Sequence, residues 1–163
     1  MLAVGDNHRN WKREKVKWRN AAYFEIIEAK AMTDSMVTVA AADMSRDLHA
    51  SGKTILYAIL FDFDKADIKP GSRPQLEEMA KLLKKDPRLS VFIVGHTDDR
   101  GTVAYNLDLS QRRAEAVVRA LATEHNVDAR QIMPKGLANF APITSNEDES
   151  GRAKNRRVEL VKQ

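Results

Sequence analysis

VFIVGHTDDRGTVAYNLDLSQRRAEAVVRAL, residues 91–121, has the pattern of a buried strand, a polar loop and an amphipathic helix. Its first five residues are apolar, as in a strand that is buried on both faces. A polar loop with glycines at positions 95 and 101 follows, and from Leu109 onward apolar residues return at the spacing of one buried helix face. In open α/β sheets ligands bind beyond the carboxyl ends of strands, and a helix N-terminus offers unpaired N–H groups to an anion. The loop between strand and helix is therefore where we expect a binding site.

Two oppositely charged side chains flank this loop. Asp98 follows the end of the strand, and Arg113 falls in the first two turns of the helix if that helix begins near residues 106 or 107, roughly 9 Å along its axis. A carboxylate and a guanidinium at this separation suit a zwitterionic ligand, because the carboxylate accepts hydrogen bonds from an ammonium group and the guanidinium holds a carboxylate with two parallel bonds. The alternative is that Asp98 and Arg113 pair with each other.

Three motifs in order along the chain carry a resemblance to a known family. The first is FDFDKA at residues 61–66 with Ile68, and the third comprises GRA at 151–153 and NRRVE at 155–159. The second lies in the stretch quoted above and consists of Gly95-His96-Thr97-Asp98, Gly101, Asn106, Leu109-Ser110 and Arg113-Ala114. In order and spacing these motifs resemble the OmpA-like peptidoglycan-binding family of cell-envelope proteins. The resemblance covers roughly residue 54 to the C-terminus.

The resemblance implies a ligand and the residues that hold it. It implies that Asp98 and Arg113 bind the amino-acid head of meso-diaminopimelate in the stem peptide of peptidoglycan, and that Gly101 lets the backbone approach that ligand closely. Thr97 belongs to the same motif, so we expect it in the ligand-binding set as well. By this resemblance the site needs no cofactor and no metal.

Further residues are expected around this set. Asn106 is expected to cap the helix and thereby fix the loop. Asp62, at the end of the neighbouring strand, either lines the same site or is solvated. Arg156 and Arg157 are expected to be structural, one facing the loop and one facing solvent. The expected ligand-binding residues are thus Asp98, Arg113, Gly101, Asp62, Thr97 and Asn106.

The chain as a whole predicts an α+β fold with the element order β-α-β-α-β-β. Strands are expected at residues 55–61, 91–95, 132–137 and 158–160. Pro134 places the third strand at a sheet edge or bulge, and Ser72 followed by Gln75 has the form of a capping box for the first helix. Residues 139–150 are polar and predict a surface loop. This order gives a two-layer α/β sandwich, with a mixed sheet and the helices on one face.

Length and composition bound the domain organisation. With 163 residues, we expect an N-terminal appendage or the end of a preceding module at 1–50, and the OmpA-like domain at 51–163. No window approaches the ~20 apolar residues of a membrane-spanning helix. The absence of cysteine excludes disulfides and thiolate metal sites. The first residues lack the pattern of a signal peptide, so we expect a mature form or a piece of a longer protein if it works outside the cytoplasm.

These observations favour a non-catalytic protein that binds peptidoglycan and anchors an envelope protein or the outer membrane to the cell wall, in the periplasm and associated with the outer membrane. The alternative is a periplasmic interaction or signalling module of the same fold, with an envelope partner bound through residues 1–50. Catalysis is disfavoured because His96 lacks further ligands at metal spacing and Ser110 lies inside a helix pattern without a strained elbow. The net charge is +4 and a basic run occupies residues 8–19, but no nucleic-acid motif accompanies it, so we expect no nucleic-acid partner.

Overall fold

The computed structural model describes residues 2–5, 11–14, 37–62 and 64–163. The chain divides into two units, Met1–Ser35 and Met36–Gln163. In the first unit, β1 (Leu2–Gly5) and β2 (Trp11–Glu14) pair antiparallel, with Leu2 opposite Glu14. Apart from residues 11–14, the basic run at 8–19 lies outside the described residues.

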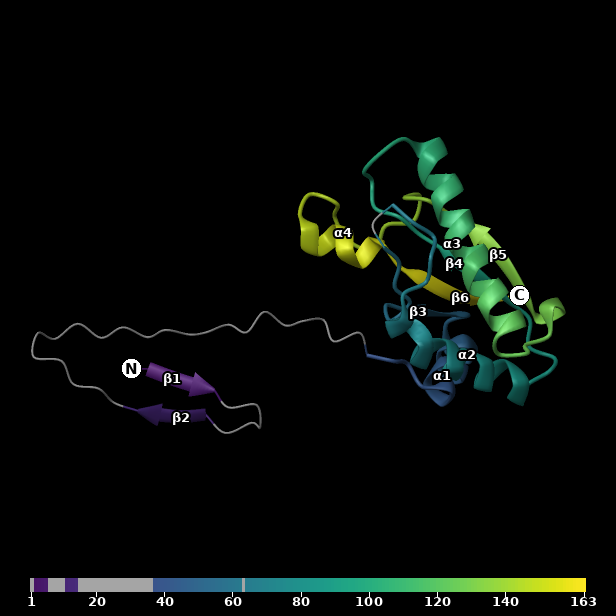
Figure 1. The fold of residues 1–163 in the computed structure, drawn as a ribbon, viewed down its shortest axis with the longest axis horizontal. Coiled ribbons are helices and arrows are strands. Elements are labelled where there is room, and N and C mark those ends of the chain that lie inside the picture. Colours follow the sequence, from purple (N-terminus) through teal and green to yellow (C-terminus); the bar gives the residue numbers. More distant parts are fainter. Residues whose placement is uncertain (1, 6–10, 15–36, 63) are drawn as a thin grey trace, which may run out of the picture. The chain divides into compact units, whose positions relative to one another are not determined.

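The second unit contains a four-stranded mixed sheet (Figure 1). Its strands are β3 (Lys53–Leu56), β4 (Val91–Gly95), β5 (Ile132–Gly136) and β6 (Val158–Lys162), in the order β3-β6-β4-β5. β6 runs antiparallel to both β3 and β4, whereas β4 and β5 are parallel. β5 is an edge strand, as Pro134 predicted, because a proline has no N–H to donate to a second neighbour.

The helices of this unit are α1 (Ala41–Ala50), α2 (Arg73–Lys85), α3 (Val103–Thr123) and α4 (Glu149–Asn155), with 3-10 turns η1 (Pro70–Ser72) and η2 (Ala129–Gln131). Buried apolar side chains of α1, α2 and α3 form the core together with the sheet. Met79 of α2 and Leu121 of α3 are fully buried against Ile93 and Leu160 of the two central strands. The two-layer α+β sandwich predicted from the element order is therefore confirmed. No helix in the described part of the chain is long and apolar enough to cross a membrane.

The compact unit takes in a helix that the sequence assigned to the preceding segment. Met44 and Leu48 of α1 are 0% and 2% exposed and belong to the main core. The backbone of Val39 is bonded to the side chain of Gln75 in α2, with N–H to Oε1 at 2.8 Å and Nε2 to O at 3.1 Å. The packed unit thus begins at Met36, ahead of the boundary expected between residues 50 and 51.

Two local predictions were wrong and a third was wrong in part, for identifiable reasons. The strand predicted at 55–61 ends at Leu56, and Ile59 is buried in the core beyond the sheet. Residues 55–61 are apolar because several of them are buried, and not because all of them belong to the strand. Ser72 and Gln75 form no capping box, because Ser72 has helical backbone angles and its Oγ accepts a hydrogen bond from the Leu60 N–H at 2.8 Å. The predicted loop at 139–150 is correct up to Asp148, where the short helix α4 begins with the Asp148 side chain as its cap.

Candidate ligand-binding site

The candidate site lies where β4 ends and α3 begins, and the start of α3 differs from the expectation. The helix starts at Val103, and Thr102 caps it by accepting a hydrogen bond from the Tyr105 N–H at 3.2 Å. Asn106 is therefore not the cap. It is buried inside the first turn, and its Nδ2 donates to the carbonyl oxygens of Asp98 at 3.3 Å and Arg100 at 3.0 Å. Asn106 thus fixes the loop, as expected, but through loop carbonyls and not through the helix end.

Gly101 lies in this loop with φ at +91°, a conformation that residues with a side chain rarely adopt. A Cβ there would meet only ordinary contacts, 3.6 Å to Cδ1 of Tyr105 and 3.7 Å to Oδ1 of Asn106. The backbone angle, and not crowding within the protein, accounts for the glycine. Its expected part in a close approach to the ligand stays a prediction.

Asp98 is buried and its carboxylate is held by two donors. Oδ1 accepts from the Arg100 N–H at 3.1 Å, and Oδ2 accepts from Nη1 of Arg156 at 2.7 Å. Thr97 is buried beside it, with its hydroxyl donating to the Asp98 carbonyl at 2.9 Å and its N–H donating to the Ala138 carbonyl at 2.9 Å. Thr97 therefore sets the path of the backbone that carries Asp98.

Arg113 is 7% exposed, and its guanidinium is bonded to backbone carbonyls. Nε donates to the carbonyl of Lys65 at 2.9 Å, Nη2 donates to the carbonyl of Asp62 at 3.4 Å, and the guanidinium carbon lies 5.0 Å from the centre of the Phe61 ring. Among the described residues, no carboxylate forms an ion pair with Arg113, and its Nη1 has no hydrogen bond. Burial lowers the pKa of Arg113 and the positive charge of Arg156 lowers it further, while interactions with Tyr105, Asp98 and Asp64 act in the opposite direction.

Asp98 and Arg113 therefore do not pair with each other in the described part of the chain. The ion pair of Asp98 is with Arg156, and Arg113 is held by carbonyls from the segment after β3. That segment includes Asp62, whose backbone contacts Arg113 while its half-exposed carboxylate pairs with Nζ of Lys69 at 3.0 Å. The hydrogen bond and the charge of Lys69 lower the pKa of Asp62.

The sequence predicted that either Arg156 or Arg157 would face this loop, and in the structure Arg156 contacts Asp98. Its Nη2 lies 2.6 Å from Oε1 of Glu149 in α4, so one guanidinium joins Glu149 to Asp98. The adjacent arginines of the NRRVE motif were the available signal, but a pattern of charges does not show which of the two faces the loop. Arg157, expected to be solvated if Arg156 faced the loop, is 4% exposed and pairs with Glu159 at 2.6 Å.

Both residues considered for catalysis, His96 and Ser110, are buried. His96 is 2% exposed, and its Nε2 lies 3.8 Å from Oε1 of Glu159. The Ser110 hydroxyl donates to the Leu107 carbonyl at 3.0 Å and accepts from the Ala138 N–H at 3.0 Å, so it joins α3 to the loop after β5. In the part of the chain that the structure describes, no group of three or more histidine, aspartate or glutamate side chains is placed to hold a metal ion.

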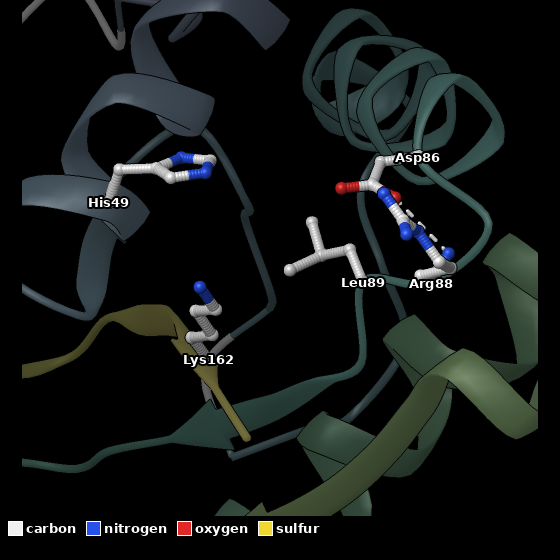
Figure 2. Close-up of a pocket in the computed structure, with 5 residues that line it drawn as sticks. All are labelled: His49, Asp86, Arg88, Leu89 and Lys162. Carbon is white, nitrogen blue, oxygen red and sulfur yellow. Dashed lines mark hydrogen bonds between the residues drawn. The ribbon is translucent and has the colours of Figure 1, made fainter.

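A pocket lies at the other end of the sheet from this site. It is lined by His49, Asp86, Arg88, Leu89 and Lys162 (Figure 2). Lys162 pairs with Val91 in the sheet, whereas the candidate site follows Gly95 at the opposite end of β4. His49 is in the last turn of α1, and Asp86 Oδ1 accepts from the Arg88 N–H at 3.1 Å. The pocket is thus separate from the residues that the motifs single out.

Comparison with known proteins identifies the family. A family model described as the OmpA family matches residues 60–156. The chain is 34% identical over 163 residues to outer membrane protein A of Bordetella avium, covering 95% of this chain and 82% of that protein. Two further curated relatives are longer, and the chain spans 29% and 47% of their lengths.

Solved structures agree with this match. The peptidoglycan-associated lipoprotein from Burkholderia pseudomallei has a TM-score of 0.60 and 38% identity, covering 70% of this chain and 92% of that chain. The cell wall anchor of the T6SS from Pseudomonas aeruginosa has a TM-score of 0.58 and 28% identity, covering 77% and 99% of the two chains. Because the family model spans more than half of the sequence and the Bordetella relative is matched over most of its length, the chain belongs to the OmpA family.

Proposed function

We propose that this domain binds peptidoglycan without catalysis, through the meso-diaminopimelate of the stem peptide, and so anchors an envelope protein or the outer membrane to the cell wall. The observation that carries the proposal is the state of Arg113. Its guanidinium is 7% exposed, is bonded to two carbonyl oxygens, and has no carboxylate partner in the described part of the chain.

A buried positive charge without an anionic partner is unfavourable, because burial removes water and nothing of opposite charge replaces it. A ligand carboxylate would supply that partner by accepting from Nη1 of Arg113, which has no hydrogen bond to any residue that the structure describes. Asp98 provides the complementary acceptor, because a carboxylate oxygen can take a further hydrogen bond from an ammonium group. The side-chain end of diaminopimelate carries one ammonium and one carboxylate on the same carbon, which fits this pair of charges.

The named relatives support the proposal. The similar Burkholderia protein is called peptidoglycan-associated, the similar Pseudomonas protein is called a cell wall anchor, and the Bordetella relative is an outer membrane protein. We accordingly propose that the domain works in the periplasm, in association with the outer membrane. A few charge-assisted hydrogen bonds on a small zwitterion give about micromolar to millimolar affinity for a single stem peptide. The wall presents many copies, so repeated engagement would retain the protein.

The test compares two stem tripeptides that differ at one group. The first is L-alanyl-γ-D-glutamyl-meso-diaminopimelate, and the second carries L-lysine at the third position and so lacks the side-chain carboxylate. The protein should bind the diaminopimelate tripeptide at least about tenfold more tightly, because the lysine peptide leaves Arg113 without its partner. Titration calorimetry or NMR shift mapping measures both affinities.

Arginine variants connect this preference to the site. Arg113→Ala should abolish the preference and the pull-down by purified sacculi. Arg130→Ala is the matched control, because Arg130 is an exposed arginine that pairs with Asp128 near the start of β5. Equal binding of the two tripeptides by the wild type, or sacculus binding by a folded Arg113→Ala variant, would reject the assignment.

A further inference from the structure

A network of charged side chains surrounds Asp98. Ion pairs join three guanidiniums to two carboxylates: Arg156 contacts Asp98 and Glu149, and Glu149 is also 3.1 Å from Nε of Arg152 and 4.0 Å from Nη2 of Arg100. Arg113 is a further guanidinium near this network, and the charges of Arg156, Asp98 and Asp64 act on it. Arg156 thus shares the Asp98 carboxylate side of the network with the buried Arg113.

Arg156 is the member of this network best placed to act on a ligand. Its side chain is 37% exposed, whereas that of its partner Asp98 is 11% exposed, so solvent reaches the guanidinium more readily than the carboxylate. Nη1 and Nη2 are used by Asp98 and Glu149, respectively, at 2.7 and 2.6 Å. An ammonium group bound at Asp98 would offset the negative charge that Arg156 faces there. A carboxylate beside that ammonium would then restore negative charge next to the guanidinium.

We propose that Arg156 makes the site selective for the free acid of the ligand, by presenting a second guanidinium to the carboxylate that sits beside the bound ammonium. This inference rests on the proposed function and names a finer specificity of the same site. A carboxylate accepts hydrogen bonds from both Arg113 and Arg156. A carboxamide in its place has no charge, and its NH₂ group is a donor that faces the N–H donors of a guanidinium. One guanidinium is then left without an acceptor.

The experiment uses the full chain and two forms of one peptide. The first is the diaminopimelate tripeptide described above, and the second has the side-chain carboxylate of diaminopimelate converted to a carboxamide. The wild type should bind the acid at least about tenfold more tightly than the amide. Arg156→Gln should reduce that ratio to about threefold or less, and Arg156→Lys should restore part of it, because lysine returns the charge without the planar fork.

Arg100→Gln is the matched control. It removes a charge from the same network, and the bond from Arg100 to the Asp98 carboxylate comes from the backbone N–H, which the substitution keeps. It should keep the wild-type ratio of acid to amide affinity. A thermal melt of each variant shows whether it is folded. If Arg156 only supports the fold, the ratio of acid to amide affinity should not change in a folded variant. An unchanged ratio in Arg156→Gln, or no preference in the wild type, overturns the inference. A wild type that fails to bind the acid peptide instead rejects the proposed function.

Discussion

At the scale of single residues, His96 gives the fold a dependence on pH. The pKa of His96 is lowered to about 4 from the ordinary 6.5, mainly by burial. The positive charges of Arg157 and, less strongly, Lys53 also lower it, whereas the negative charge of Glu159 raises it. Because the pKa is lowered in the folded protein, the unfolded chain binds a proton between pH 6.5 and 4 that the folded chain does not. The contribution of His96 to stability is therefore complete above pH 6.5 and declines as the pH falls toward 4, reaching a loss of about 2 kcal/mol near pH 4.5. Urea unfolding of the wild type and His96→Gln at pH 7.5 and 4.5 measures it. The wild type should lose about 2 kcal/mol more than the variant, and equal losses would show that other groups account for the acid sensitivity.

At the scale of elements, the start of α3 shows what the sequence could and could not predict. The motif spacing correctly placed Asp98 after a strand and Arg113 on the next helix, because period and punctuation determine which element a residue joins. It placed the cap at Asn106 instead of Thr102, because both side chains cap helices well, and it could not show that Arg156, 58 positions away, pairs with Asp98. Thr102 and Asn106 predict different costs when they are replaced. Thr102→Ala removes one exposed cap bond and should reduce the unfolding free energy by about 1 kcal/mol. Asn106→Ala removes two bonds from a buried amide, should cost about 2 kcal/mol or more, and should also weaken tripeptide binding because it frees the loop that carries Asp98. Equal costs in urea unfolding, with binding intact in both variants, would contradict these assigned roles.

For the chain as a whole, the division into two units predicts which N-terminal deletions preserve folding and binding. The buried core that the structure describes and every proposed ligand-binding residue lie within Met36–Gln163. Deleting residues 1–35 should therefore leave the urea midpoint and the tripeptide affinity unchanged. Deleting residues 1–50 removes Met44 and Leu48 from the core and the Val39 backbone bonds to Gln75 as well, and should cost at least ~3 kcal/mol. The shorter deletion also separates our proposal from the alternative of an interaction module, because an envelope partner that binds through the first unit should be lost while binding to sacculi persists. If removing residues 1–35 abolishes tripeptide binding, the site is not contained in the compact unit, and wall anchoring must depend on both parts of the chain.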